Sequence, residues 1–542
     1  MLVPCFILLI FTISCGGNGV TPPDINLDIS NISGPTSMFY EGSATFSVTA
    51  SGDSGIKYSW TVEPASAGTF GSPSAASTTF KPSDLDDSTS ITIRVTISSN
   101  NTEPETLSIS VTIATGQAVS WGGTGDDIVR DIAVDTDGLI YLTGTVGVSA
   151  DFDPGPNLRQ NDGDPCFLAR YDLDCSYDWA VTWESDDAVA VEVSGDGRIA
   201  VGGSYIGAPD FDPGPGEFTQ YAMQEGAYVS LFDEIGVFQW GYATPGRVWS
   251  EIINLQQYDY DNRYYNMDVA WDPIGNLFYL QRVVWITSWS GDPRYHTPPG
   301  SYEGDAANVI MWNSILDYQW STGVASGYDG NRMAVDSLGQ AYFAGIQNDA
   351  TYIGHIDAEG HPLWHINGDR LSEYFDIAVD SNDRALVAGI IMAEGDYDCL
   401  LAVYTNDASR PVWLQWGSFS DDAATGVAPA HDGGILITGW FTGTADFDPG
   451  PDLEVVEMTA HHGYFLLKLS STGDFEWVRT WGGTFGEWIY DPCIAVDDSG
   501  SIIITGSFDG TADLDPGPEA DVHESAGGAD VYIIRTGPDG LL

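Results

Sequence analysis

Positive charge is scarce in this chain. Its 542 residues include 18 Lys and Arg against 78 Asp and Glu, so the formal net charge at pH 7 is −60. Only Lys57, Lys81 and Lys468 are lysines. Proteins that bind nucleic acid neutralise phosphates with Lys and Arg, and a polybasic patch is what holds a protein on an anionic membrane surface. The composition therefore argues against both partners.

The apolar run at the N-terminus, residues 2–14, is too short to span a bilayer. It is followed by Cys15 and a Gly-rich stretch, which is typical of a signal peptide. The segment Thr12-Ile13-Ser14-Cys15 resembles the lipobox of bacterial lipoproteins, and this resemblance implies a lipid on Cys15. Residues 1–20 are thus predicted to be a lipoprotein-type signal peptide and tether. The protein is expected at the bacterial cell envelope or surface, held to the membrane only by this lipid, or secreted if Cys15 carries none.

Cysteine is also rare, with six in the chain. Once Cys5 and Cys15 are assigned to the signal segment, four remain, and none forms a Cys-x-x-Cys pair. We expect these four to be small buried apolar residues rather than disulfide partners. They are Cys166, Cys175, Cys399 and Cys493.

Residues 21–115 alternate apolar and polar positions in short runs, such as Lys57–Val62 and Ile91–Ile97. Period-two alternation with turn-rich spacers predicts an antiparallel β-sandwich. The stretch from Tyr58-Ser59-Trp60 to the final Thr-rich strand resembles bacterial immunoglobulin-like or polycystic-kidney-disease-type domains. That resemblance implies a spacer that holds a functional module away from the membrane.

Residues 117–542 are repetitive, and a tetrad of the type Ile-Ala-Val-Asp recurs seven times. Each copy is followed by a turn and by further short strands, so each repeat predicts four antiparallel strands. Seven such units predict a seven-bladed β-propeller and an all-β protein. The copies are Ile132–Asp135, Val191–Ser194, Val269–Asp272, Met333–Asp336, Ile377–Asp380, Val427–Ala430 and Ile494–Asp497.

The two ends of this repetitive region complement each other. The last repeat stops after Tyr532–Thr536 and a turn, without a fourth strand, whereas Gln117–Gly123 matches the fourth-strand segment Trp477–Gly483. We therefore expect N-terminal and C-terminal strands to pair in the last blade and close the ring.

The Trp-Gly-Gly, Ile-Ala-Val-Asp and Thr-Gly-Ser-Phe elements, with a recurring Phe-Asp-Pro-Gly, resemble the SBBP-type bacterial β-propeller repeat family. The resemblance spans residues 117–542 and is most specific in the first, second, sixth and seventh repeats. It implies the fold and a surface or extracellular location, and it implies no reaction.

A block of the type Asp-Phe-Asp-Pro-Gly-Pro follows the second strand of four repeats. Its Asp-x-Asp-x-Gly core resembles the start of an EF-hand loop, and crowded carboxylate oxygens are the ligands that Ca²⁺ prefers. The alternative is turn chemistry, in which Pro-Gly fixes the turn, Phe or Leu is a buried anchor and the aspartates cap backbone amides. The candidate ligands are Asp151, Asp153, Asp210, Asp212, Asp446, Asp448, Asp513 and Asp515.

The third repeat is longer than the others and rich in aromatic residues. Aromatic rings with a few polar partners suit recognition of sugars or peptides. The alternative is that these rings fill space inside a divergent repeat. The candidate ligand-binding residues are Trp285, Trp289, Arg294 and Tyr295.

No catalytic signature was found, including Gly-x-Ser-x-Gly, His-Glu-x-x-His and phosphate loops. We predict a non-catalytic, monomeric surface protein whose propeller binds a protein or a glycan. It is expected to need no cofactor, with Ca²⁺ as the one candidate. The competing hypotheses are a polysaccharide-active propeller enzyme and a structural surface protein with Ca²⁺-stabilised loops.

Overall fold

The computed structural model describes residues 28–542 except 35–36, 40–43, 52–54, 84–88, 100–102, 115, 162, 254–255, 290–299, 327, 348–349, 369–370, 394, 409–411, 459–461 and 485–490. The predicted signal peptide and Cys15 lie outside these residues. Every regular element in the described chain is a β-strand, so the predicted all-β class is confirmed. The same residues contain no helix of the length and hydropathy needed to cross a membrane.

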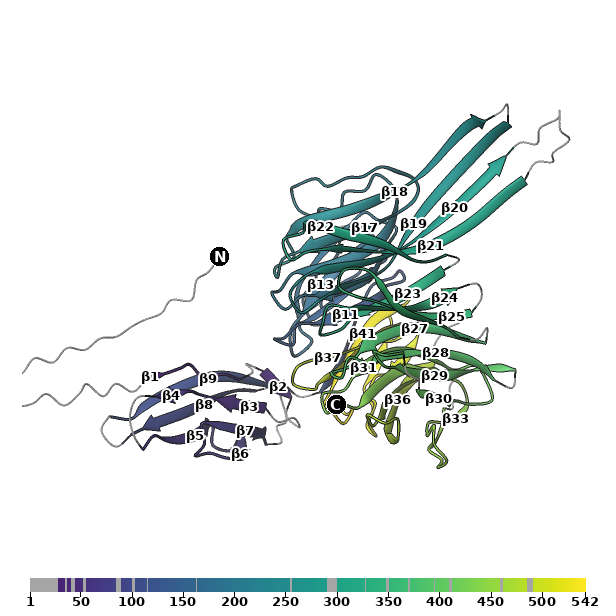
Figure 1. The fold of residues 1–542 in the computed structure, drawn as a ribbon. Helices are drawn as coiled ribbons and strands as arrows, with labels where there is room; N and C mark the ends of the chain where they lie inside the picture. Colours follow the sequence, from purple (N-terminus) through teal and green to yellow (C-terminus); the bar gives the residue numbers. More distant parts are fainter. Residues whose placement is uncertain are drawn as a thin grey trace, which may run out of the picture.

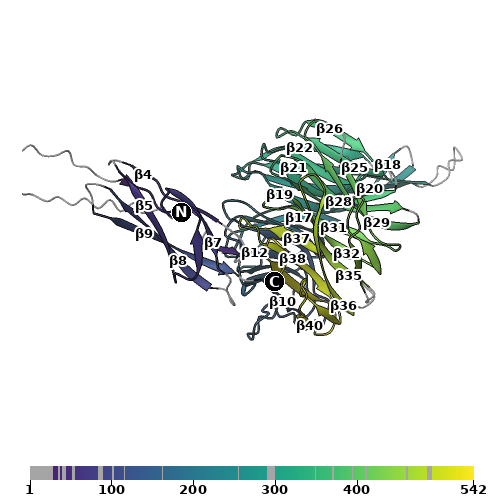
Figure 2. The same ribbon diagram turned by 90° about the horizontal axis from the view of Figure 1, so that it is seen from below.

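The first nine strands form a unit in front of the repeats (Figures 1 and 2). One sheet has the order β2-β9-β8-β5 and another has the order β3-β7-β6. Trp60, Phe46 and Phe80 are buried in their common core, and Trp60 Nε1 donates a 2.9 Å hydrogen bond to Ala75 O. The strands are β1 (Asp28–Ile29), β2 (Ser37–Phe39), β3 (Ala44–Ser47), β4 (Ala50–Ser51), β5 (Lys57–Glu63), β6 (Gly68–Phe70), β7 (Ser77–Pro82), β8 (Thr89–Ser98) and β9 (Glu105–Ala114).

The repeats fold as successive antiparallel sheets of four strands, and the sheets of repeats two and three are joined through β18 and β19. In repeats one to three the strands are β11 (Ile128–Val134), β12 (Ile140–Thr145), β13 (Cys166–Tyr171), β14 (Tyr177–Trp183), β15 (Asp187–Val193), β16 (Ile199–Gly207), β17 (Ala222–Phe232), β18 (Phe238–Ile253), β19 (Gln256–Trp271), β20 (Leu277–Trp289), β21 (Gly300–Trp312) and β22 (Tyr318–Ser326).

Repeats four and five follow the same order, and repeat six continues beyond its fourth strand into short strands of repeat seven. Their strands are β23 (Tyr328–Val335), β24 (Ala341–Gln347), β25 (Ala350–Ile356), β26 (Pro362–Asn367), β27 (Ser372–Val379), β28 (Ala385–Ala393), β29 (Asp396–Tyr404), β30 (Val412–Trp416), β31 (Ala423–Pro429), β32 (Ile435–Phe441), β33 (Thr444–Asp446), β34 (Val455–Glu457), β35 (Gly463–Leu469) and β36 (Phe475–Thr484).

The last sheet combines strands from both ends of the repetitive region, in the order β10-β41-β38-β37. The register pairs Gln117 with Arg535 and Trp121 with Val531. The strands are β10 (Gln117–Trp121), β37 (Cys493–Val496), β38 (Ile502–Phe508), β39 (Thr511–Asp513), β40 (Val522–Glu524) and β41 (Asp530–Thr536).

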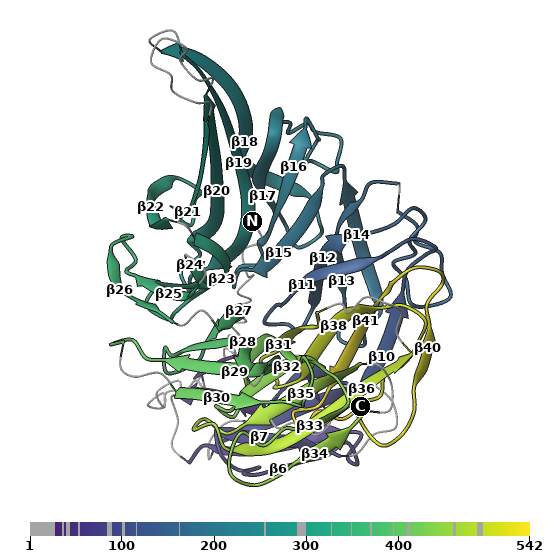
Figure 3. The same ribbon diagram turned by 90° about the vertical axis from the view of Figure 1, so that its right-hand side faces the viewer.

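The sheets are arranged like the blades of a propeller, with their first strands toward a common centre (Figure 3). These first strands contact one another in the order β11, β15, β19, β23, β27, β31, β37, and β37 in turn contacts β11. The apolar cores lie between neighbouring sheets. One core, for example, combines Leu401 of repeat five with Ile437 and Phe465 of repeat six.

The turns between first and second strands share one geometry. In most repeats a Gly with positive φ ends the turn, as at Gly138 (φ 80°) and Gly500 (φ 88°). Repeat five has Asp383 at this place, with φ 55°. A positive φ costs a Cβ-bearing residue more than Gly, and Asp is among the residues that tolerate it.

The four cysteines of the described chain are free thiols, and Cys166, Cys175 and Cys399 are buried. The prediction that they act as small buried residues is therefore confirmed for these three. Cys493 is half-buried and lies on β37, toward the centre of the ring of sheets.

Candidate functional site

The four Asp-Pro-Gly loops have the same hydrogen-bond pattern. In repeat one, the amides of Asp153 and Arg159 donate to Asp151 Oδ1 at 3.3 and 2.6 Å, and Gly155 N donates to Asp153 Oδ1 at 2.7 Å. The corresponding bonds recur in repeats two, six and seven. One oxygen of each aspartate therefore caps backbone amides of its own loop.

The apolar residue of each loop anchors it between two repeats. Phe152 is 2% exposed and packs on Trp121 of the preceding fourth strand, with ring centroids 5.0 Å apart. The three equivalent residues are equally buried, each in a core that contains the last Trp of the preceding fourth strand. These pairs are Phe211 with Trp183, Phe447 with Trp416, and Leu514 with Trp481.

These contacts account for the motif by turn chemistry and packing. Among the described residues, no three His, Cys, Asp or Glu side chains come together in a metal-binding arrangement. Ca²⁺ binding by the eight loop aspartates stays a prediction.

Three of the loops are also joined to the preceding fourth strand by backbone pairing. Asp151 N donates to Gly122 O and Asp446 N donates to Gly417 O, both at 3.0 Å, and Asp513 pairs with Gly482. In each case the glycine directly follows the buried Trp. At the junction of repeats one and two the residue after Trp183 is Glu184, and in the described chain no corresponding pairing joins it to Asp210.

The glycine is required where two carboxylates approach it. A Cβ on Gly417 would lie 2.7 Å from Asp422 Oδ2 and 2.8 Å from Asp398 Oδ1. A Cβ on Gly122 would meet Asp530 Oδ1 and Asp127 Oδ2 at 2.5 and 2.7 Å. We call these two places the sealed junctions.

Burial is the main cause that raises the pKa of Asp422, Asp127 and Asp530 to about 6 at the sealed junctions. For Asp127, the nearby Asp530 and Asp126 raise the pKa further, while amides of Gly147 and Gly123 oppose the shift. In the sealed junctions an aspartate, Asp398 or Asp530, stands near the start of the third strand. At the junction of repeats one and two, Pro165 takes the equivalent place, directly before the third strand. A side chain after Trp183 is therefore tolerated.

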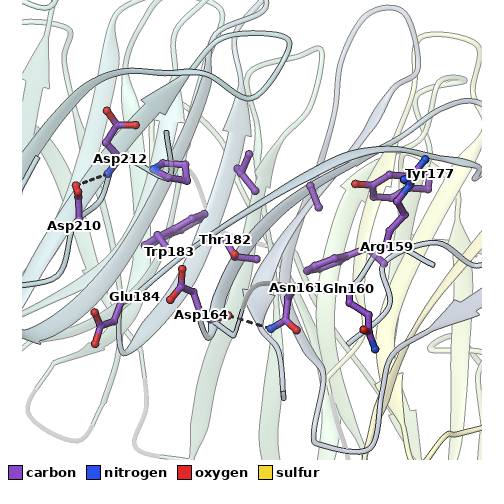
Figure 4. A pocket seen from close by; sticks show the side chains of 14 residues that line it. Arg159, Gln160, Asn161, Asp164, Tyr177, Thr182, Trp183, Glu184, Asp210 and Asp212 are labelled. Atoms are coloured by element: carbon purple, nitrogen blue, oxygen red, sulfur yellow. Dashed lines mark hydrogen bonds between the residues drawn. The ribbon is translucent and has the colours of Figure 1, made fainter. Parts of the chain in front are cut away.

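The unsealed junction carries a groove of about 430 Å³ along the outer strand β14 (Figure 4). Its lining includes Ala180, Val181 and Thr182 and the buried Trp183, whose Nε1 donates to Tyr228 OH at 3.0 Å. Polar side chains line the two sides: Arg159, Gln160, Asn161, Asp164, Tyr177, Glu184, Asp210 and Asp212. Asn161 is held by its Nδ2, which donates to Gly147 O and Asp164 O.

A second cavity, of about 270 Å³, lies at the centre of the ring and is lined by the first strand of every repeat. Three aspartates at equivalent positions link neighbouring repeats across it. Val191 N donates to Asp131 Oδ2 at 2.8 Å, Met333 N to Asp268 Oδ2 at 2.6 Å, and Val427 N to Asp376 Oδ2 at 2.8 Å.

Arg332 occupies the equivalent position in repeat four and faces these aspartates, with its Nε 3.9 Å from Asp376 Oδ1. Burial would lower the pKa of Arg332, but Asp268, Asp131 and Asp376 together raise it above its ordinary value. Burial raises the pKa of Asp376 to about 6 and that of Glu192 to about 7, and Arg332 opposes the shift of Asp376. At the centre, the positive charge of Arg332 is thus balanced by neighbouring carboxylates whose pKa values are raised by burial.

These central residues were not predicted from the sequence, although it carries a signal for them. Each stands directly before the Ile-Ala-Val-Asp tetrad of its repeat, as Asp131, Asp268, Arg332 and Asp376 do. A charged residue at the same place before a buried strand in four of the seven repeats indicates that these positions have a common structural role.

Of the four residues predicted to bind a ligand in the third repeat, two lie on a strand. Trp285 and Trp289 belong to β20, where the backbone pairs them with Asn262 and Tyr258 of β19. Arg294 and Tyr295 lie outside the described residues. Strands β18–β21 extend beyond the other sheets (Figure 1), so the described part of the extra length of this repeat forms strands.

No family model and no curated protein matches the chain. Among solved structures, the chain is similar to a protein of unknown function from Bacteroides caccae, with 14% identity, 62% of this chain and 93% of that chain covered, and a TM-score of 0.30. It is similar to Sqt1 from Chaetomium thermophilum, with 11% identity, 78% and 99% covered, and a TM-score of 0.35. It is also similar to dipeptidyl peptidase 4 of Porphyromonas gingivalis, with 8% identity, 71% of this chain and 57% of that chain covered, and a TM-score of 0.34. Likenesses this distant carry no argument about activity.

Proposed function

We propose that residues 117–542 form a seven-bladed β-propeller of the SBBP type, closed by β10 and β41, and that residues 21–115 form an immunoglobulin-like spacer. The cyclic contacts of the first strands and the mixed last sheet support closure. The two sheets around Trp60 support the spacer. A lipid on Cys15 would then hold the monomer at the bacterial surface.

The propeller is proposed to bind a glycan without turning it over, at the groove between repeats one and two. One observation carries this proposal. At this junction the seal found elsewhere is missing, and the gap is lined by side chains that both donate and accept hydrogen bonds. Concave sites with converging polar groups are the usual places for ligands.

The chemistry of the groove favours a neutral sugar over a charged ligand. Asp164, Glu184, Asp210 and Asp212 accept hydrogen bonds only, whereas Arg159 and the amides supply donors. A sugar hydroxyl both donates and accepts, so one glycan satisfies both sets. An anionic glycan would be repelled by these carboxylates and by the net charge of −60. The half-buried ring of Tyr177 supplies an apolar contact.

The test is a screen of neutral glycans against the full chain, followed by titration calorimetry of the best binder. Tyr177→Ala and Thr182→Ala should each weaken binding about tenfold, equivalent to about 1.4 kcal/mol. Thr480→Ala is the matched control, because Thr480 precedes Trp481 as Thr182 precedes Trp183, at a junction where Gly482 pairs with Asp513.

Two results would overturn this proposal. Equal binding by all three variants would place the ligand elsewhere. Release of shorter saccharides, measured on the same mixtures, would make the protein an enzyme.

A further inference from the structure

Hairpin turns of one type lie on one face of the ring of sheets. They join the first strand of a repeat to the second and the third strand to the fourth, whereas the Asp-Pro-Gly loops lie on the other face. In each turn the amide of the fourth residue donates to the carbonyl of the first, as Gly275 N does to Asp272 O at 3.0 Å. The third residue is polar in most of these turns, as at Asp137, Asp196 and Ser499. A polar residue is what a solvated turn favours.

Four turns of repeats two, three and four have an apolar third residue instead. These residues are Ile235, Ile274, Ile315 and Leu338, each between 63% and 76% exposed. Val237, in the same turn as Ile235, is a further exposed apolar residue. The equivalent turns form with polar residues, so the fold does not require apolar side chains at these positions. We call the five residues the apolar patch.

The turns of repeats three and four that carry the patch lie side by side. A Cβ on Gly275 would lie 3.6 Å from Ser314 Cβ, so the two turns of repeat three are in contact. A Cβ on Gly339 would lie 3.8 Å from Asp272 Cβ, which joins repeat four to them. The turn between β19 and β20 lies at the opposite end of these strands from the tips that project in Figure 1.

Arg198 links repeat two to the same surface. Its Nη1 donates to Ser314 O at 3.0 Å and its Nη2 donates to Gly275 O at 3.2 Å. A Cβ on Gly197 would lie 4.0 Å from Glu234 Cβ, so the turn with Ile235 adjoins the turn with Arg198. The patch is therefore one continuous arc over three repeats. Single exposed apolar residues are ordinary, but a contiguous group of them indicates an interaction surface.

The surroundings of the patch are negatively charged. Arg198 is the only cation in its four turns and the adjoining turn 194–198, and it is bound by Asp196 and lies 4.5 Å from the centre of the Trp271 ring. A cavity of about 360 Å³ next to Ile274 and Leu338 has five carboxylates in its lining and, among the described residues, no Lys, Arg or His. The acids of the five turns are Asp196, Asp233, Glu234, Asp272, Asp317 and Asp336.

We propose that the apolar patch docks a basic segment of a partner protein, in which Lys or Arg side chains flank apolar ones. The apolar side chains of the segment would cover the patch, and its cations would face the surrounding carboxylates. A second copy of this chain, with its own net charge of −60, is repelled, and so is an anionic membrane. The proposal goes beyond glycan binding and does not depend on the groove.

A random-peptide display selection on the full chain tests this proposal. Peptides that also bind the variant Ile274→Ser/Ile315→Ser are removed by counter-selection. This variant should keep the wild-type unfolding temperature, because both residues are exposed and Ser499 occupies the same turn position in repeat seven. We expect the remaining peptides to combine apolar residues with Lys or Arg. The proposal is overturned if no peptide remains or if the remaining peptides lack basic residues.

Calorimetry with the strongest remaining peptide measures the two contributions. Ile274→Ser/Ile315→Ser should lower its affinity at least about tenfold, because less apolar surface is buried. Glu234→Gln/Asp317→Asn should lower it about threefold in low salt, and this difference should shrink in about 0.5 M NaCl. Leu453→Ser changes an equally exposed residue on the other face and should have no effect. Wild-type affinity in the Glu234→Gln/Asp317→Asn variant would refute the charge complementarity.

Two further measurements distinguish the other occupants of such a surface. Sedimentation velocity would reveal a dimer of the full chain, and co-sedimentation with neutral phosphatidylcholine vesicles would reveal lipid binding. We expect neither. Dimer formation or vesicle binding that Ile274→Ser/Ile315→Ser abolishes would assign the patch to a second copy or to a lipid surface, and either result would overturn the proposal.

Discussion

Two junctions between neighbouring repeats share a buried Phe beside a Trp, and they differ in the backbone bond that closes one of them. Between repeats five and six, Phe447 packs near Trp416 and Asp446 N bonds Gly417 O. Between repeats one and two, Phe211 packs near Trp183, but Glu184 takes the place of the glycine. The apolar anchor is buried at both junctions, whereas the junction with Gly after the Trp is closed by a backbone bond and the junction with Glu184 carries a groove.

The anchors should matter equally at both junctions, and this is the largest effect that we expect. Phe447→Ala and Phe211→Ala each remove a side chain that is at most 1% exposed. Such truncations cost about 3–5 kcal/mol of unfolding free energy, measured by urea unfolding. Leu453→Ala, in the same loop as Phe447 but 76% exposed, is the control and should cost less than about 0.5 kcal/mol. An effect at only one junction would break the comparison.

The sealed junctions should make stability depend on pH. Burial raises the pKa of Asp422 and Asp127 to about 6 from an ordinary value of 3.8, so the folded state holds protons that the unfolded state releases. Their contribution is fully present below pH 3.8 and is lost as the pH rises through about 6.

Unfolding curves between pH 4 and 7.5 check this dependence. The double variant Asp127→Asn/Asp422→Asn should flatten the profile by about 1–3 kcal/mol, since one pKa unit corresponds to about 1.4 kcal/mol. Asp186→Asn, at an exposed position of the unsealed junction, should leave the profile unchanged. A double variant with the wild-type slope would refute the assignment.

An alanine side chain directly after the Trp should have different effects on stability at the two junctions. Gly417→Ala places a Cβ 2.7 Å from Asp422 Oδ2, so the junction must move, at a cost of about 1–3 kcal/mol. Glu184→Ala, at the equivalent exposed place, should change thermal stability by less than about 0.5 kcal/mol. Equal costs for the two variants would show that the seal does not depend on this residue.

The smallest effect concerns the loop aspartates. Changing Asp151, Asp210, Asp446 or Asp513 to Asn keeps an oxygen acceptor but removes the charge that strengthens two amide bonds, so each change should cost about 0.5–1.5 kcal/mol. We expect the same cost in EDTA and in millimolar Ca²⁺. A rise in the unfolding midpoint with Ca²⁺ that the Asn variants lose would instead make these loops metal sites.

The repeating parts of the fold were predictable from the sequence because each copy carries the same tetrad, turn and Trp. Capping of backbone amides by the loop aspartates was one of two alternatives predicted from the sequence, and the structure contains these hydrogen bonds. The groove was not predicted, because Glu184 and Gly417 are recognised as equivalent positions only once the strand order is known. The extended strands around Trp285 were not predicted, because aromatic content alone does not distinguish a loop from a longer strand.

The most direct test of the central claim closes the groove. Glu184→Gly restores the Trp-Gly sequence of the sealed junctions, so the amide of Asp210 can pair with the chain after Trp183 and narrow the gap. Calorimetry with the best neutral glycan from the screen should show at least a tenfold loss of affinity, with unchanged thermal stability. Full affinity in this variant would contradict the assignment of glycan binding to this groove.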